Sequence, residues 1–117
     1  MKKMVLLLSL AVAAPAFASE TWNVVEGSQG AVKGNWNIVR QGTTVTGSAK
    51  MSAPHASVVS FGLAGKAENG VVTMKRVDAS DHVDCVYRGA MKGDGSIVGA
   101  SICGAQHGPW IAQPIRK

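Results

Sequence analysis

The sequence predicts an all-β protein, a small antiparallel up-and-down β-barrel of about eight strands with one disulfide bond. β-Branched residues alternate repeatedly with polar ones, and no segment keeps apolar residues at helical spacing over about ten residues. The 117-residue chain has 14 glycines, several of which follow Gln, Asn or Asp as in tight hairpin turns. A closed barrel leaves no unpaired edge strand, which favours it over the alternative, a β-sandwich.

Each expected strand is a short run in which apolar and polar residues alternate, and it is bounded by residues typical of turns. The first two carry the similar segments WNVV and WNIV, and the third, TTVTGSAKM, follows a Gln-Gly turn. The fourth, SVVSFGLAGKA, and the fifth, VVTMKRV, flank an Asn-Gly turn. The sixth, VDCVYRGAMK, and the seventh, SIVGASIC, flank an Asp-Gly turn, and PWIAQPI is the eighth. In chain order we expect strands at 21–26, 35–41, 43–51, 57–67, 71–77, 83–92, 96–103 and 109–115.

The N-terminus has the pattern of a cleaved secretory signal peptide at residues 1–18. A Lys-Lys start precedes an apolar run at 4–14 and the small-residue sequence AFA, which ends at Ala18. The apolar run is shorter than the roughly 20 residues that a membrane-spanning helix needs, so we expect no stable membrane insertion. Cleavage near Ala18 leaves a single barrel domain at 19–117 in a periplasmic or secreted protein.

The charge of this domain is only mildly basic. Removing the signal takes two of the 12 basic residues and leaves all seven acidic ones, for a net charge of +3. The charges are scattered singly rather than gathered in runs, and the exported location argues against nucleic acid as a partner. The partner expected from the sequence is an unknown small ligand or an envelope protein.

Cys85 and Cys103 are the only cysteines, and an even count in an exported protein indicates a disulfide bond. If the sixth and seventh strands pair around Gly93-Asp94-Gly95, these cysteines face each other directly. Facing residues lie about 4.5 to 5.5 Å apart between Cα atoms, within the range of a disulfide. The chain has no Cys-x-x-Cys motif, so the sequence gives no support for thiol redox catalysis.

The candidate binding residues gather at one end of the predicted barrel. Alternate connections of a meander lie at the same end, so the three tight turns share one end. The longer segments GSQGAVKG, SAPHAS, DASDH and GAQHGP share the other, where loops on a rigid scaffold favour binding. The candidate rim residues at this long-loop end are Trp36, Trp110, His55, His82 and His107.

These residues have two interpretations each. Three converging imidazoles would bind Zn²⁺ or Cu²⁺, with Asp81 as a further ligand, whereas the alternative is three independent exposed histidines. The tryptophans either stack on a ligand or pack in the core. If Trp36 faces inward, Arg40 does so too and needs a partner or an exit to solvent near the tight-turn end.

The sequence predicts no enzyme. Serines are present but Gly-x-Ser-x-Gly is not, and the glycine-rich segments have no strand-to-helix setting. Asp81 and His82 are adjacent, so on a strand they would face opposite sides. We therefore expect neither catalytic residues nor an organic cofactor.

The segment GNWNIVRQGTTVTGSAKM at 34–51 resembles the opening hairpin of avidin-like and lipocalin-like (calycin-type) barrels, and GPWIA at 108–112 is similar in kind. The resemblance implies an antiparallel barrel with a ligand at its open end. The lipocalin-like Gly-x-Trp normally opens the first strand, whereas here the Trp22 segment precedes it. The residues that hold biotin in avidins have no matching positions, so no binding residue is carried over.

Three functions follow from these observations. The first is an exported, non-enzymatic protein that binds a small ligand with the loops of its open end. The alternative is a protein-binding module, such as an inhibitor of an envelope hydrolase or protease, whose loops enter a partner's cleft. Metal binding by the histidine loops is the third. A wide cavity favours the first, and an interior filled by tryptophan and methionine favours the second.

Overall fold

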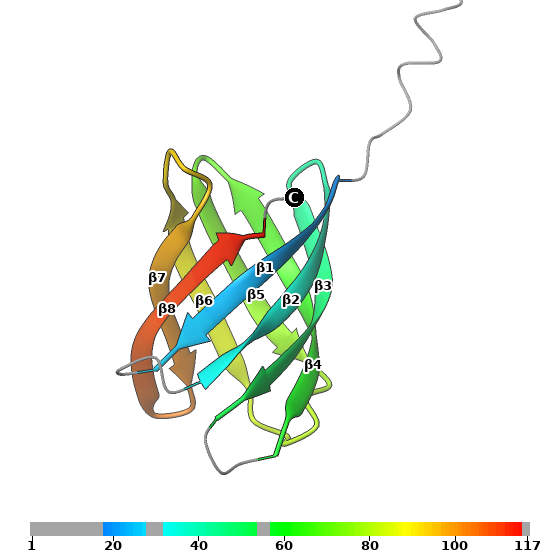
Figure 1. Ribbon diagram of the computed structural model, residues 1–117, viewed down its shortest axis with the longest axis vertical. Helices are drawn as coiled ribbons and strands as arrows, with labels where there is room; N and C mark the ends of the chain where they lie inside the picture. The colour runs from blue at the N-terminus through cyan, green and yellow to red at the C-terminus, as the bar shows by residue number, and fades with distance from the viewer. Residues whose placement is uncertain (1–17, 28–31, 54–56, 116–117) are drawn as a thin grey trace, which may run out of the picture.

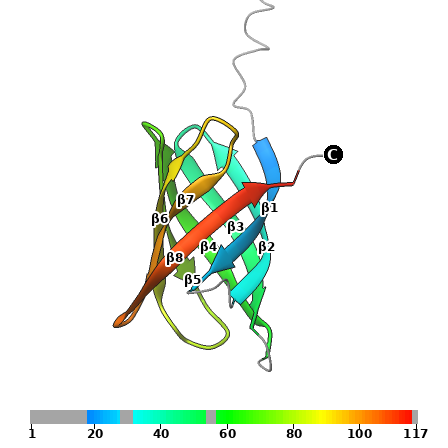
Figure 2. The ribbon, with the colours of Figure 1, turned by 60° about the vertical axis from the view of Figure 1, so that its left-hand side comes forward.

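The computed structural model describes residues 18–27, 32–53 and 57–115, which form a closed antiparallel barrel (Figure 1). Each strand pairs with the next along the chain, and β8 pairs with β1 to close the barrel (Figure 2). The barrel prediction is confirmed, and the sandwich alternative is wrong. The strands are β1 (Ala18–Glu26), β2 (Val32–Gln41), β3 (Thr44–Ser52), β4 (Val59–Glu68), β5 (Val71–Val77), β6 (Cys85–Met91), β7 (Ile97–Cys103) and β8 (Gln106–Pro114).

The connections separate into two ends, as the meander predicts. The β2–β3, β4–β5 and β6–β7 turns lie at the tight-turn end, uppermost in Figure 1, where β1 begins and β8 ends. The β5–β6 connection, residues 78–84, is the longest described segment at the opposite, long-loop end. In the part of the chain that the structure describes, no helix is long and apolar enough to span a membrane.

One expected long loop is wrong. The segment at 104–109 was predicted to be a rim loop, but β7 ends at Cys103 and β8 begins at Gln106. Only residues 104–105 form the turn, because Gly104 adopts a φ of 63°, which a two-residue hairpin connection requires. His107 therefore lies on β8, where its side chain is exposed to solvent.

The barrel interior is filled by the chain's own side chains. Trp36 lies at its centre, with ring centroids at 4.8 Å from Tyr87, 5.5 Å from Trp110 and 5.9 Å from Phe61. The Trp36 Nε1 donates a hydrogen bond to the Met51 sulfur at 3.1 Å. The largest fully buried side chains are Trp22, Trp36, Trp110, Tyr87, Ile38, Met51, Met74 and Ile97. The interior is thus a packed core.

Glycine is required where strands of this small barrel approach closely. A Cβ at Gly65 would collide with the Thr73 carbonyl oxygen, and one at Gly99 would collide with that of Arg88. Both glycines continue the inward-facing positions of their strands, and a residue without Cβ lets the strand bend there.

The disulfide between Cys85 and Cys103 forms as predicted. The two cysteines are directly opposite in the β6–β7 register, and their Cα atoms are 4.1 Å apart. The tight turn between β6 and β7 sets this register, so turn geometry and covalent bond specify the same pairing.

Candidate functional site

The inward face of β1 places one carboxylate at each end of the filled interior. Glu20, Trp22, Val24 and Glu26 alternate along this strand, and the two apolar residues between the carboxylates are fully buried. Each glutamate meets an arginine from another strand. Both ends of the core are therefore closed by an acid–arginine pair.

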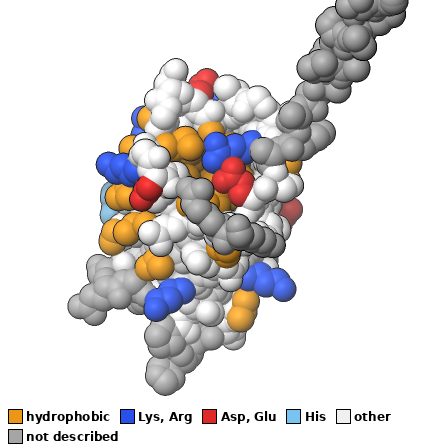
Figure 3. Space-filling model, turned by 45° about the horizontal axis from the view of Figure 1, so that its top comes forward, with side chains coloured by type: hydrophobic (Ala, Val, Ile, Leu, Met, Phe, Trp, Pro, Cys, Tyr) orange, Lys and Arg blue, Asp and Glu red, His pale blue; other side chains and the backbone are white. Residues whose placement is uncertain are grey.

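The pair at the tight-turn end is partly open to water. Arg40 lies 3.2 Å from a Glu20 carboxylate oxygen, and about a quarter of each side chain is exposed, 24% and 27%. Trp22 Nε1 donates to the same carboxylate at 2.6 Å. Figure 3, which looks toward this end, shows acidic and basic side chains side by side. Arg40 faces inward as expected and has both a partner and partial exposure to solvent.

The pair at the long-loop end is buried and belongs to a larger group. We call Glu26, Phe61, Arg76, Asp81 and Tyr87 the Arg76 cluster. Arg76 and Glu26 side chains are only 7% and 8% exposed, with 3.7 Å between Nη2 and Oε1. Arg76 Nε donates to the Tyr87 hydroxyl at 2.8 Å, and that hydroxyl donates to Glu26 at 3.2 Å. The guanidinium carbon lies 4.2 Å from the Phe61 ring centroid, a cation–π contact.

Burial dominates the electrostatics of this cluster. It raises the pKa of Glu26 above its ordinary value of 4.5, more than the charge of Arg76 and hydrogen bonds from Tyr87 and Ser101 lower it. Burial also raises the pKa of Tyr87, and the negative charge of Glu26 adds to that rise. The tyrosine hydroxyl therefore stays protonated and serves as a donor to Glu26. The Glu26 carboxyl and the Tyr87 hydroxyl both make contacts inside the protein, which suits them to stabilise the fold.

Replacing Glu26 with glutamine is expected to remove a pH dependence of stability. Because the folded pKa of Glu26 lies above its ordinary value, the stability contribution of this carboxyl is fully present below pH 4.5. It is lost as the pH rises through the folded pKa. Over that window the wild type should lose up to about 1.4 kcal/mol per pH unit relative to Glu26→Gln. Urea unfolding of both proteins at a series of pH values checks this, and parallel stability curves would contradict it.

The Arg76 cluster also holds the 78–84 loop. Arg76 Nη1 lies 3.6 Å from an Asp81 carboxylate oxygen, and that same oxygen accepts the Val83 backbone N–H at 3.0 Å. The backbone N–H of His82 donates to Ala79 at 2.9 Å. These contacts hold His82 at a φ of 59°, a left-handed conformation that few residues other than glycine adopt.

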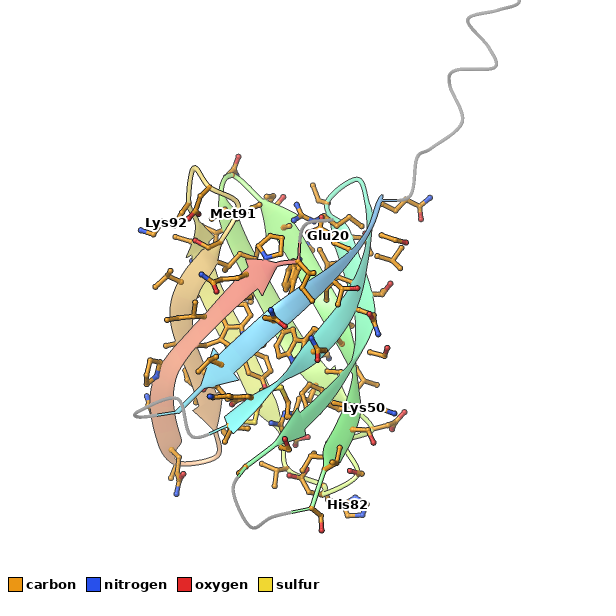
Figure 4. The ribbon with its side chains drawn as sticks, in the orientation of Figure 1. Glu20, Lys50, His82, Met91 and Lys92 are labelled. Carbon is orange, nitrogen blue, oxygen red and sulfur yellow. A yellow bond between two sulfur atoms is a disulfide. The ribbon has the colours of Figure 1, made fainter. Side chains whose placement is uncertain are left out.

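A second set of contacts fixes the first half of this loop to β4. The Ser80 N–H donates to the Ser60 carbonyl at 2.9 Å, and the Ser60 N–H donates to Ser80 Oγ at 3.0 Å. Ala79 is buried against the core. The loop is therefore preorganised from both sides, and it exposes His82 and Val83 at the long-loop end, where His82 points away from the barrel (Figure 4).

The structure separates the residues that the sequence grouped at the rim. Trp36 and Trp110 lie in contact with each other and are fully buried, as the core-packing interpretation expects and the ligand-stacking interpretation does not. Their strands begin four residues before each tryptophan, so neither ring is at the mouth. His82 is on the loop and His107 on β8, both exposed. His55 lies outside the described residues.

The described ranges bring together no group of three His, Cys, Asp or Glu side chains that could hold a metal ion. Zinc or copper binding by His55, His82 and His107 depends on His55 and stays a prediction. Among the candidate rim residues that the structure describes, His82 is the one on a fixed, exposed loop.

The buried Glu26–Arg76 pair was missed at the sequence level, although a signal for it exists. Glu26 continues the alternation of Trp22 and Val24, and Arg76 continues that of Val72 and Met74. Both charges therefore fall on inward positions. The alternation does not show that Glu26 on β1 and Arg76 on β5 meet at the same point inside the barrel.

Comparison with known proteins gives no assignment: no family model matches the chain, and neither a curated protein nor a solved structure is similar to it.

Proposed function

We propose that this chain is an exported, non-catalytic protein-binding module that presents the 78–84 loop to a cleft in a partner protein. The observation that carries the proposal is the combination of a filled interior with a loop fixed to it by Arg76. A filled barrel favours the protein-binding alternative over a small-ligand carrier. Its working surface is then the outside of the barrel.

The fixed loop supports this function energetically. Binding costs free energy for every side chain and loop that must be ordered on association. Here the ion pair of Asp81 and the reciprocal Ser60–Ser80 hydrogen bonds order the loop before any partner arrives. Val83, whose side chain is 41% exposed, and His82 beside it then form a rigid tip of one apolar and one polar group.

The class of partner that fits such a tip is a protein with a preformed cleft, as in a hydrolase or protease of the cell envelope. Inhibitors of such enzymes bind with little change in backbone. The resemblance to avidin-like and lipocalin-like barrels supports a binding role, since both are up-and-down barrels that work as scaffolds. The predicted signal peptide supports a periplasmic or secreted location.

The test places a photo-crosslinking residue at Val83, in the full chain expressed in the organism of origin. We expect a discrete covalent adduct with one protein. The matched control carries the same residue at Asn37, an exposed position on β2, and should give no such adduct. Identical adducts from both positions would contradict the proposal.

The captured partner is then titrated with purified protein. The variant His82→Ala/Val83→Ala is expected to bind about tenfold or more weakly, because a few residues at the centre of an interface carry most of the binding energy and we place this loop tip there. The control variant Asn35→Ala/Asn37→Ala should bind as the wild type does. If the partner is a hydrolase, its activity should fall to zero at equimolar inhibitor.

A further inference from the structure

A groove runs across the outer wall of β4, β5 and β6, away from the 78–84 loop. Its volume is about 530 Å³, and it reaches toward the tight-turn end at Asn69. Strand register places Lys66, Thr73 and Arg88 in one row across the three strands. The neighbouring row holds Ala64, Lys75 and Val86. We call this hollow the β4–β6 groove.

The side chains that line the β4–β6 groove carry mostly positive charge. Lys66, Lys75 and Arg88 line it, and Glu68 at one end is the acidic residue among its lining. Arg88 Nη1 donates to Thr73 Oγ1 at 3.3 Å, which holds the guanidinium over the middle of the groove. The sequences of β5, β6, β7 and β8 contain no Asp or Glu. Strands β5 to β8 therefore contribute no negative charge to the wall beside the groove.

An apolar surface continues from the groove along β6, β7 and β8, which lie side by side in Figure 2. Val86 on the groove faces Ile102 across the β6–β7 register, and Val98 faces Ile111 across β7–β8. These four side chains are 38% to 45% exposed. The β1–β3 wall differs, because asparagine side chains hydrogen-bond to one another across its strands.

We propose that the β4–β6 groove binds an extended segment of a partner protein in which acidic residues alternate with apolar ones. The three cations match carboxylates, while Val86 and the adjoining wall match the apolar side chains. In an extended segment successive side chains point to opposite sides. A segment that lies with one edge toward the wall can therefore direct its acids to the cations on one side and its apolar groups to Val86 and the β6–β8 wall on the other. This site is separate from the loop and does not depend on the function proposed for it.

The charge and the shape of the β4–β6 groove favour an acidic extended segment over a second copy of the chain or a membrane surface. A second copy of the chain that docked groove to groove would present the same cations, and like charges repel. A membrane surface is broad, whereas the groove is a recess between side chains of three strands. A second groove of about 750 Å³ over β2, β3 and β4 also has two lysines, Lys33 and Lys50. Asp78 offsets one of these charges, and Asn35, Asn37 and four serines add uncharged polar groups to its lining.

The experiment measures fluorescence anisotropy of a capped heptapeptide of alternating glutamate and valine, titrated with the full-length mature protein. We expect it to bind about tenfold more tightly than the same peptide with glutamine in place of glutamate. Lys66→Glu/Lys75→Glu should weaken binding by about tenfold or more. The matched control, Lys33→Glu/Lys50→Glu, makes the same change of net charge in the other groove and should weaken binding by less than about threefold.

Three results would overturn the proposal. Equal weakening by both lysine pairs would show a diffuse charge effect, and equal binding of the glutamine peptide would show that the cations do not matter. Competition by anionic phosphatidylglycerol vesicles, with no effect of neutral vesicles, would assign the surface to a membrane. Circular dichroism confirms that both variants fold. Since His82→Ala/Val83→Ala should leave the peptide affinity unchanged, failure here and failure of the loop proposal are distinguishable.

Discussion

Replacing Arg76 with methionine is expected to lower the free energy of unfolding by about 3 to 5 kcal/mol at neutral pH. The substitution leaves the Glu26 carboxylate buried without a countercharge, and it removes the hydrogen bond from Arg76 to Tyr87. Urea denaturation measures the loss. Because Asp81 also loses its contact with Arg76, hydrogen exchange at Val83 should accelerate in this variant.

The matched control is Arg40→Met at the other end of the same barrel. Its partner, Glu20, is of the same type, but the pair is about a quarter exposed, so the expected cost is about 0 to 1 kcal/mol. The double variant Glu26→Gln/Arg76→Met removes both buried charges and should recover part of the stability lost in Arg76→Met alone. Equal costs for the two arginines would refute the role given to burial.

Replacing Trp36 with alanine is expected to cost about 3 to 5 kcal/mol, because it empties the centre of the aromatic core. Trp36 contacts the rings of Trp22, Phe61, Tyr87 and Trp110. Thermal and urea unfolding measure the loss.

Indole provides the control for this second variant. An apolar cavity left by a large side chain stays dry and accepts a small aromatic molecule. Indole should therefore raise the melting temperature of Trp36→Ala and leave that of the wild type unchanged. A similar gain for the wild type would show that its interior already has room for a ligand.

Much of this architecture follows from local sequence. The Gly93-Asp94-Gly95 turn sets the β6–β7 register, and that register alone places Cys85 opposite Cys103. The alternation along β2 likewise places Arg40 on the inward face, where it requires a partner or an exit to solvent. Short-range turn chemistry and a two-residue period are enough for such conclusions.

The candidate site depends on information that local patterns lack. Glu26, Arg76 and Tyr87 come from β1, β5 and β6, so their meeting depends on how the barrel curves and closes. Local patterns left Trp36 either at the mouth or in the core, because β2 begins at Val32, before the residues with the clearest alternation. The sequence does not predict the two-residue turn after β7. The polar residues that follow this turn have the composition of a loop, although they pair with β7.

The chain's own side chains occupy the barrel interior, and we infer from this that any partner binds on the outer surface. Native mass spectrometry of the folded protein purified from its organism of origin tests this most directly. We predict that the mass of the monomer equals that of the mature chain with one disulfide bond. A stoichiometric small molecule that is retained by the folded protein and released on unfolding would contradict it.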